Sequence, residues 1–288
     1  MSLVVVGVLA IAVALAVHAV LIAPSSLRTS VIEVPVTDLA PALDGYTLVV
    51  LTDIHHWASS ESRHIRRMVA LANATDADLY VLLGDYGASF KHNQLLSAAC
   101  YERALPALGN ALRRLRSRDG LVAVLGNHDH YYDGSRVAEW LRSLGVQVLI
   151  NDHIVVRRED GALAIGGVGD AIEDRVDPMG GGGARPEGVP LIVLSHNPDG
   201  VLALSRACGA RLVLSGHTHG GQISIPGYGA PVTFTTVCGR RTASGWVPNA
   251  TAPLYVSRGV GSQWPIRFRC PPEVLVVRLR VVPDQQPA

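Results

Sequence analysis

Five short runs of apolar residues, each followed at once by a polar motif, constrain the fold of this chain more than any other feature. The runs are rich in Val and Leu and span Thr47–Leu51, Leu79–Leu83, Leu121–Leu125, Leu191–Leu194 and Arg211–Leu214. Continuous apolar runs of this length are typical of β-strands that are covered on both faces. Helical patterns lie between the first runs, with apolar residues such as Ile65 and Met68 on one face and arginines on the other.

The second half of the chain has a different character, because its apolar segments are joined by turns without long helical patterns. Residues 151–168, 222–225, 254–256 and 274–281 are predicted as strands, and Asn197-Pro198 is predicted to start a helix. We therefore predict an α/β fold with two mixed β-sheets packed as a sandwich and flanked by helices. Ligands of open α/β sheets bind outside the carboxyl ends of the strands. All five polar motifs are expected at that edge.

The N-terminal segment differs from the rest of the chain, since only His18 interrupts an apolar stretch from Leu3 to Ala23. A helix of this length spans about 30 Å, the hydrocarbon thickness of a bilayer. No Lys or Arg precedes the stretch, which favours an uncleaved anchor over a signal peptide. We predict a single-pass transmembrane anchor at residues 1–24, a linker with a short strand at 25–45, and a catalytic domain at 46–288. Arg28, directly after the helix, favours a cytoplasmic catalytic domain.

Charge and cysteine content exclude other classes of protein. Lys plus Arg number 25 against 24 for Asp plus Glu, so no charge imbalance indicates a nucleic-acid partner. The four cysteines lie far apart with no C-x-x-C pair, and they form neither a disulfide framework nor a sulfur zinc site. The sequence does not indicate an oligomeric state.

The polar motifs combine carboxylate, amide and imidazole groups, which are the ligands of hard and borderline divalent cations. They are Asp53-Ile54-His55, Gly84-Asp85, Gly126-Asn127-His128-Asp129, Ser195-His196-Asn197 and Gly216-His217-Thr218-His219. Taken singly, each motif is more often a turn, a cap or a polar pair than a metal site. Their joint occurrence, each after a predicted strand, indicates a metal centre.

This set of blocks resembles the calcineurin-like metallophosphoesterase superfamily, whose motifs are D-x-H, G-D, G-N-H-[DE], a single His and G-H-x-H. The resemblance extends over residues 46–279. The segments 215–222, 255–261, 267–268 and 270–273 resemble the bacterial membrane-associated YkuE-type branch, which is similar to enzymes that cleave UDP-diacylglucosamine in lipid A synthesis.

The resemblance implies two divalent metal ions, Mn²⁺ above all, with Zn²⁺ or Fe²⁺ as alternatives. It implies these ligands: Asp53, His55 and His219 on the first metal, Asp85 as the bridge, and Asn127, His196 and His217 on the second. A shared hydroxide between the metals then attacks the phosphorus. His128 is left to contact the phosphate and to protonate the leaving oxygen.

One position departs from the pattern of the related Ser/Thr phosphatases. These have a second aspartate three residues after the bridging one, which orients the catalytic histidine, whereas this chain has Ala88. His128 therefore needs another orienting group, or it acts as an electrostatic clamp. Arg258 is a candidate for binding a substrate phosphate, and the alternative is an arginine that holds the last loop.

The predicted function is a membrane-anchored phosphohydrolase that cleaves a phosphodiester or pyrophosphate bond in a lipid-linked or nucleotide-sugar substrate. One alternative is an outward-facing phosphodiesterase acting on cell wall or nucleotides. A second, of a different class, is a non-catalytic, metal-stabilised scaffold that binds a membrane partner. The complete ligand set counts against the scaffold, because a scaffold loses ligands without penalty.

Overall fold

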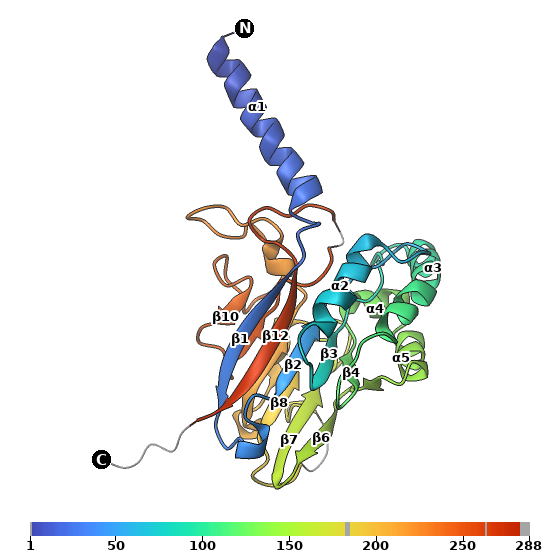
Figure 1. Ribbon diagram of the computed structural model, residues 1–288, viewed down its shortest axis with the longest axis vertical. Coiled ribbons are helices and arrows are strands. Elements are labelled where there is room, and N and C mark those ends of the chain that lie inside the picture. Colours follow the sequence, from blue (N-terminus) through green and yellow to red (C-terminus); the bar gives the residue numbers. More distant parts are fainter. Residues whose placement is uncertain (1, 182–184, 263, 283–288) are drawn as a thin grey trace, which may run out of the picture.

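Two six-stranded β-sheets packed face to face form the centre of the protein (Figure 1). The structure is a computed structural model that describes residues 2–181, 185–262 and 264–282. The strand order in the first sheet is β1 (Arg28–Val36), β12 (Glu273–Val281), β2 (Thr47–Leu51), β3 (Leu79–Leu83), β4 (Leu121–Val124) and β5 (Gln147–Val148). The order in the second is β10 (Gly245–Val247), β11 (Leu254–Val256), β9 (Ala210–Ser215), β8 (Leu191–Leu194), β7 (Gly161–Gly167) and β6 (Asp152–Arg158).

Both sheets are mixed. In the first sheet β12 runs antiparallel to β2, while β2, β3, β4 and β5 are mutually parallel. In the second sheet β7, β8, β9 and β11 are parallel, and the edge strands β6 and β10 are antiparallel to their neighbours. The predicted fold class, two mixed sheets forming a sandwich with helices outside, is confirmed.

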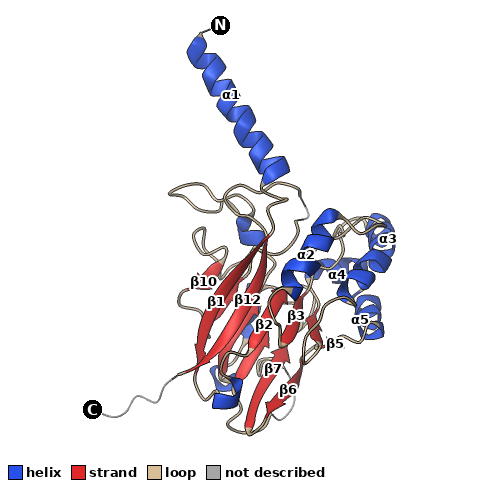
Figure 2. Cartoon of the chain, in the orientation of Figure 1, coloured by secondary structure: helices blue, strands red, loops and turns tan. Residues whose placement is uncertain are grey.

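Helices cover the outer face of the first sheet (Figure 2). They are α2 (Arg63–Asn73), α3 (Gln94–Leu112), α4 (Asn127–Tyr132) and α5 (Gly134–Ser143). The outer face of the second sheet packs against short 3₁₀ segments and loops instead. One of these segments, Pro198–Ala203, lies where a helix was predicted to start at Asn197, whose side chain accepts a hydrogen bond from the Asp199 N–H. The remaining 3₁₀ segments are Pro41–Leu43, Arg206–Cys208 and His219–Gly221.

The central strands are apolar on both faces because both faces are covered. In β2, Val49 and Leu51 pack in the cluster beneath the helices, whereas Leu48 and Val50 pack in the cluster between the two sheets. This arrangement explains the unbroken apolar runs of the sequence. It also brings the carboxyl ends of the parallel strands of both sheets to one edge, where the polar motifs follow.

The N-terminal helix α1 (Leu3–Val17) continues as a π-helix, His18–Ile22, and projects from the sheets (Figure 1). Residues 3–22 are long and apolar enough to cross a membrane. The base of this helix is attached to the domain, because the Arg267 N–H donates to the Ala19 carbonyl oxygen at 2.9 Å.

The short strand predicted within residues 25–45 is β1, which spans Arg28–Val36 and pairs along its whole length with β12. Part of the segment predicted as a linker is therefore an edge strand of the first sheet. The division of the chain into anchor, linker and catalytic domain stays a prediction.

Candidate metal centre

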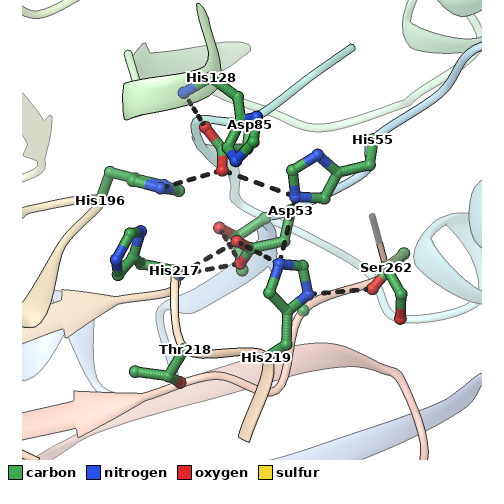
Figure 3. Close-up of polar contacts among 12 residues, drawn as sticks. Asp53, His55, Asp85, His128, His196, His217, Thr218, His219 and Ser262 are labelled. Atoms are coloured by element: carbon green, nitrogen blue, oxygen red, sulfur yellow. Dashed lines mark hydrogen bonds and ion pairs between the residues drawn. The ribbon is translucent and has the colours of Figure 1, made fainter. Parts of the chain in front are cut away.

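The predicted ligands all lie just beyond the carboxyl ends of parallel strands. Asp53 and His55 follow β2, Asp85 follows β3, and Asn127 opens α4 after β4. From the second sheet, His196 follows β8, and His217 and His219 follow β9. The sandwich thus brings side chains from both sheets together at one edge, as Figure 3 shows.

One group consists of Asp53, His55 and His219, whose ligand atoms lie within 4.8 Å of one another. The Nε2 atoms of His55 and His219 are 3.1 Å apart, and His219 Nε2 is 3.5 Å from Asp53 Oδ1. His219 Nδ1 lies 3.3 Å from the Gly261 carbonyl oxygen. When Nδ1 carries the proton and donates to this carbonyl, the Nε2 lone pair points at the group.

A second group consists of Asp85, His196 and His217, also within 4.8 Å of one another. The amide of Asn127 joins it, with Oδ1 2.9 Å from His217 Nδ1 and 3.3 Å from His196 Nε2. Asp85 Oδ2 lies 3.3 Å from His196 Nε2 and 3.5 Å from His55 Nε2. The Asp85 carboxylate therefore stands between the two groups, where an anionic bridge between two cations is needed.

The donor atoms fit divalent cations, because the carboxylate and imidazole atoms of each group lie within 4.8 Å of one another in a largely buried site. His196 Nδ1 is 2.6 Å from the Leu83 carbonyl oxygen, and its Nε2 faces the oxygens of Asp85 and Asn127. Despite burial, the Asp85 carboxylate raises the pKa of His196 well above its ordinary value, and a cation bound here would take the place of that proton. Buried His217 Nε2 has no hydrogen-bond partner among the residues that the structure describes. Burial lowers the pKa of His55 well below its ordinary value and lowers that of His219 to about 4. Neutral imidazoles of this kind are metal ligands.

Several of these residues adopt a backbone conformation that side chains with a Cβ rarely take. Positive φ angles, between 46° and 66°, occur at Asp53, His55, Asp85, His217 and His219. Each costs on the order of 1–3 kcal/mol and persists only where the surroundings enforce it. The Asp53 N–H donates to the Gly84 carbonyl and the His55 N–H to the Asp85 carbonyl, each at 3.0 Å. Strain collected at a single site in this way indicates function.

A glycine allows the two halves of the second group to approach. A Cβ on Gly126 would lie 2.3 Å from Asp85 Oδ1 and 2.8 Å from the His196 ring. No side chain fits there, so the glycine of the G-N-H-D motif is a packing requirement of the bridging carboxylate.

His128 is oriented by Ser89, a residue that sequence reasoning did not single out. His128 Nδ1 lies 3.0 Å from the Ser89 carbonyl oxygen, and the Ser89 hydroxyl donates to the His128 carbonyl at 2.6 Å. Ser89 directly follows Ala88, so the backbone beside the missing aspartate supplies the contact. A carbonyl fixes the ring but carries no full charge, and it stabilises an imidazolium less than a carboxylate does.

Asp129 was also missed as a functional residue, although the sequence showed it within the G-N-H-D motif. Its buried carboxylate accepts the N–H groups of Gly126 at 2.7 Å, Asp85 at 2.9 Å and Tyr86 at 3.0 Å, and the Tyr101 hydroxyl. Burial and the nearby Asp85 raise the pKa of Asp129 to about 6. Asp129 thus ties the Asp85 loop to the Asn127 loop. The sequence signal that could have identified Asp129 is its position three residues after Gly126, the glycine that caps α4.

Arg267 plays the corresponding role on the other side of the site. This fully buried arginine donates to the carbonyl oxygens of His219 at 3.3 Å, Cys270 at 3.2 Å and Arg258 at 2.9 Å. Its pKa is lowered by burial. Arg258, the candidate for phosphate binding, instead pairs with Glu273 and donates to Ser30 Oγ at 2.8 Å. Its predicted role stays a prediction, and the observed contacts are those of a residue that holds the loop.

A cavity of about 390 Å³ opens above the site. Asp85, His128 and His217 line its floor, and Ile172, Phe234 and Trp264 contribute apolar side chains to its walls. Polar groups converging in an apolar recess are typical of a small-molecule site. The site therefore combines two groups of candidate metal ligands with a cavity that can hold a small molecule.

Residues 46–221 match the calcineurin-like phosphoesterase family, and the chain belongs to it. This family hydrolyses phosphoesters with a dinuclear divalent metal centre, and the structure provides two groups of candidate ligands for one. The chain is therefore a metal-dependent phosphoester hydrolase.

Three relatives illustrate the range of the family. The phosphodiesterase YaeI of Escherichia coli is 29% identical, over 81% of this chain and 82% of its own. The metallophosphoesterase YkuE of Bacillus subtilis is 29% identical, over 82% and 80%. The UDP-2,3-diacylglucosamine pyrophosphatase LpxG of Chlamydia trachomatis is 26% identical, over 82% and 84%. The predicted likeness to YkuE is confirmed.

Proposed function

We propose that this protein is a membrane-anchored, two-metal phosphohydrolase that cleaves a phosphodiester or pyrophosphate bond in a lipid-linked substrate. The observation that carries the proposal is the Asp85 carboxylate, whose Oδ2 lies within 3.5 Å of a ring nitrogen from each ligand group. The predicted ligands divide accordingly: Asp53, His55 and His219 for one metal, Asn127, His196 and His217 for the other, and Asp85 for both.

When bound, two divalent cations lower the pKa of coordinated water and neutralise charge on the phosphoryl oxygens. The residues of the chain set the geometry for this chemistry. His128 lines the cavity floor beside Asp85, and the Ser89 carbonyl leaves its Nε2 as the nitrogen that faces substrate. In its protonated form, His128 is placed to contact a phosphate oxygen and to give a proton to the leaving oxygen. Mn²⁺ is the proposed metal, because oxygen and imidazole ligands are mixed.

Two observations support a lipid-linked substrate. The cavity wall carries exposed apolar side chains, with Phe234 74% and Trp264 66% exposed. The apolar helix α1 leaves the domain on the side where these loops lie (Figure 1). LpxG, named for a diacylated nucleotide sugar, provides a precedent within the family for this class of substrate.

The proposed topology places the catalytic domain in the cytoplasm, from the positive charge of Arg28 after the helix. Protease added to intact spheroplasts should then leave the domain uncleaved. Cleavage without lysis would place it outside and support the alternative, an outward-facing phosphodiesterase acting on cell wall or nucleotides.

The test of catalysis is Asp85→Asn, which keeps the volume of the side chain and removes the bridging charge. We expect turnover of bis-p-nitrophenyl phosphate to fall by about 10³-fold, from the weight of metal electrostatics in such steps. Asp44→Asn is the matched control, because Asp44 is an exposed carboxylate paired with Arg280. If the Asp85 variant keeps more than about a tenth of wild-type turnover, the bridging assignment is wrong. A wild-type protein with two metals and no activity on any phosphodiester or pyrophosphate substrate would instead support the non-catalytic scaffold.

A further inference from the structure

The loops at the base of α1 carry large apolar side chains that the fold leaves uncovered. Trp57, Phe234 and Trp264 are 61%, 74% and 66% exposed, and Ile266 is 39% exposed. Exposed clusters of this kind mark interaction surfaces. Trp57 and Pro265 line one recess together with Pro24 and Ser25, the residues that follow the helix. Trp57 is therefore close to the point where α1 joins the domain, and so is the segment of Trp264, which directly precedes Pro265.

Arginines occur in the same two loops as Phe234 and Trp264, the loop between β9 and β10 and the loop between β11 and β12. A recess of about 340 Å³ is lined by Arg240, Arg241, Arg258 and Arg269. Arg258 is paired with Glu273, whereas the other three form no salt bridge within the described part of the chain. Arg240 stacks over the Tyr228 ring at 4.3 Å, and Arg241 donates to the Gly227 carbonyl at 3.0 Å. Their charge is left for a partner outside the domain.

Backbone hydrogen bonds connect the arginine recess to the helix. The Arg267 N–H donates to Ala19 of the helix, the Phe268 N–H to Gln222, and the Ser224 N–H to Phe268, each at 2.9 Å. In Figure 1 the orange loops and the red loop that precedes β12 gather where α1 enters the domain. The aromatic side chains, the arginines and the helix base thus belong to one face, which we call the α1 face.

We propose that the α1 face docks onto an anionic bilayer surface, so that the mouth of the active-site cavity opens at the lipid headgroups. This inference rests on the proposed membrane anchor. Tryptophan and arginine suit such a surface, because the indole ring sits at the headgroup level and the guanidinium pairs with lipid phosphate. The face continues an apolar helix whose residues 3–22 can span the hydrocarbon. Phe234 and Trp264, which line the cavity, would then contact the acyl chains of the substrate while its phosphate reaches the metal ligands.

Tryptophan fluorescence in the full-length chain tests the docking. The chain is reconstituted into phosphatidylcholine vesicles with 30% phosphatidylglycerol, a composition chosen to be anionic, with and without phosphatidylcholine brominated on the upper acyl chain. One version retains only Trp264 and a matched version retains only Trp246, which is 47% exposed on β10. In each version the other three tryptophans are changed to Phe. Brominated lipid should lower Trp264 fluorescence by about twofold or more, as for an interfacial indole, and leave Trp246 fluorescence unchanged.

Charge is tested separately in the Trp264 version. Arg240→Gln with Arg241→Gln should weaken docking by roughly fivefold per arginine, so that quenching falls in vesicles with phosphatidylglycerol. The control pair is Arg113→Gln with Arg116→Gln, exposed residues beyond the end of α3 and before β4, at the end of the strands opposite the site. Unchanged metal content and thermal unfolding confirm that both double variants are folded.

Carbonate extraction separates this proposal from the anchor on which it rests. Protein that resists extraction but shows equal quenching at Trp264 and Trp246 is anchored without docking, which overturns the proposal. If the two double arginine variants lose quenching equally, the inference that Arg240 and Arg241 bind anionic lipid is overturned. If carbonate extracts the protein and brominated lipid does not quench it, both the transmembrane anchor and the docking are refuted. If carbonate extracts the protein but Trp264 is quenched more than Trp246, docking of the α1 face is supported and the transmembrane anchor is refuted.

Discussion

Replacing Asp129 by Asn should destabilise the protein by an amount that its four contacts define. Oδ1 accepts from the Tyr86 N–H and the Tyr101 hydroxyl, and Oδ2 accepts from the N–H groups of Gly126 and Asp85. The amide nitrogen of Asn fits best in the Oδ1 position, where the hydroxyl can rotate to accept from it. The Tyr86 N–H then stays buried without a partner, at a cost of about 1–3 kcal/mol. Lost charge assistance at Oδ2 brings the total to about 2–4 kcal/mol.

Thermal unfolding of the detergent-solubilised chain measures this loss. For a domain of this size, Asp129→Asn should lower Tm by about 5–15 °C. Tyr101→Phe is the comparator, because it removes one of the four donors and leaves the carboxylate charged. It should cost about 1–2 kcal/mol and therefore less than Asp129→Asn. Equal stability of the Asp129 variant and the wild type would refute the view that this carboxylate holds the two loops together.

Other expectations follow from the same geometry. Purified protein should contain about two divalent ions per chain by atomic emission, and full activity with a single ion would contradict the dinuclear site. His128→Ala should reduce turnover of a p-nitrophenyl diester by about tenfold and of an alkyl diester by about 10²–10³-fold, with both metals retained; equal losses would make His128 a phosphate clamp. Deleting residues 1–24 should leave hydrolysis of small diesters unchanged and reduce that of lipid-dispersed substrates, because the anchor supplies only proximity. Precipitation of the truncated protein would indicate that the segment packs into the domain.

The fold was predictable because buried strands have a strong local signal. Strands covered on both faces must be apolar at every position, and β2 and β3 are buried along their whole length. The ligand positions followed from the same signal, since residues after parallel strands meet at one edge. Edge strands lack this property. β1 has exposed or half-buried residues at most positions, and its true start at Arg28 is set by pairing with β12, far along the chain.

The supporting residues of the site could not be predicted for a related reason. Ser89 acts through its backbone carbonyl, a group that every residue has, so its identity carries no signal. Arg267 lies in a segment that resembles the YkuE-type branch, but it acts by binding carbonyl oxygens on loops distant in sequence, and no local pattern predicts that role. Asn197-Pro198 has the local chemistry of a helix start, but the segment forms only a 3₁₀ turn against the second sheet. Tertiary packing decides such cases.

Two buried charged residues, Asp129 and Arg267, hold the strained ligand loops in place although neither is a predicted metal ligand. The anionic Asp129 gathers N–H groups from the loops of the first sheet, and the cationic Arg267 gathers carbonyl oxygens from loops around His219. Each charge is compensated by backbone dipoles, which is how a buried ion is tolerated away from a counter-ion. Asp53 joins the two halves, because its N–H donates to Gly84 while its carboxylate accepts the His217 N–H at 3.1 Å. The ligand geometry is thus enforced by the protein, and cations would meet a site whose strain has already been offset.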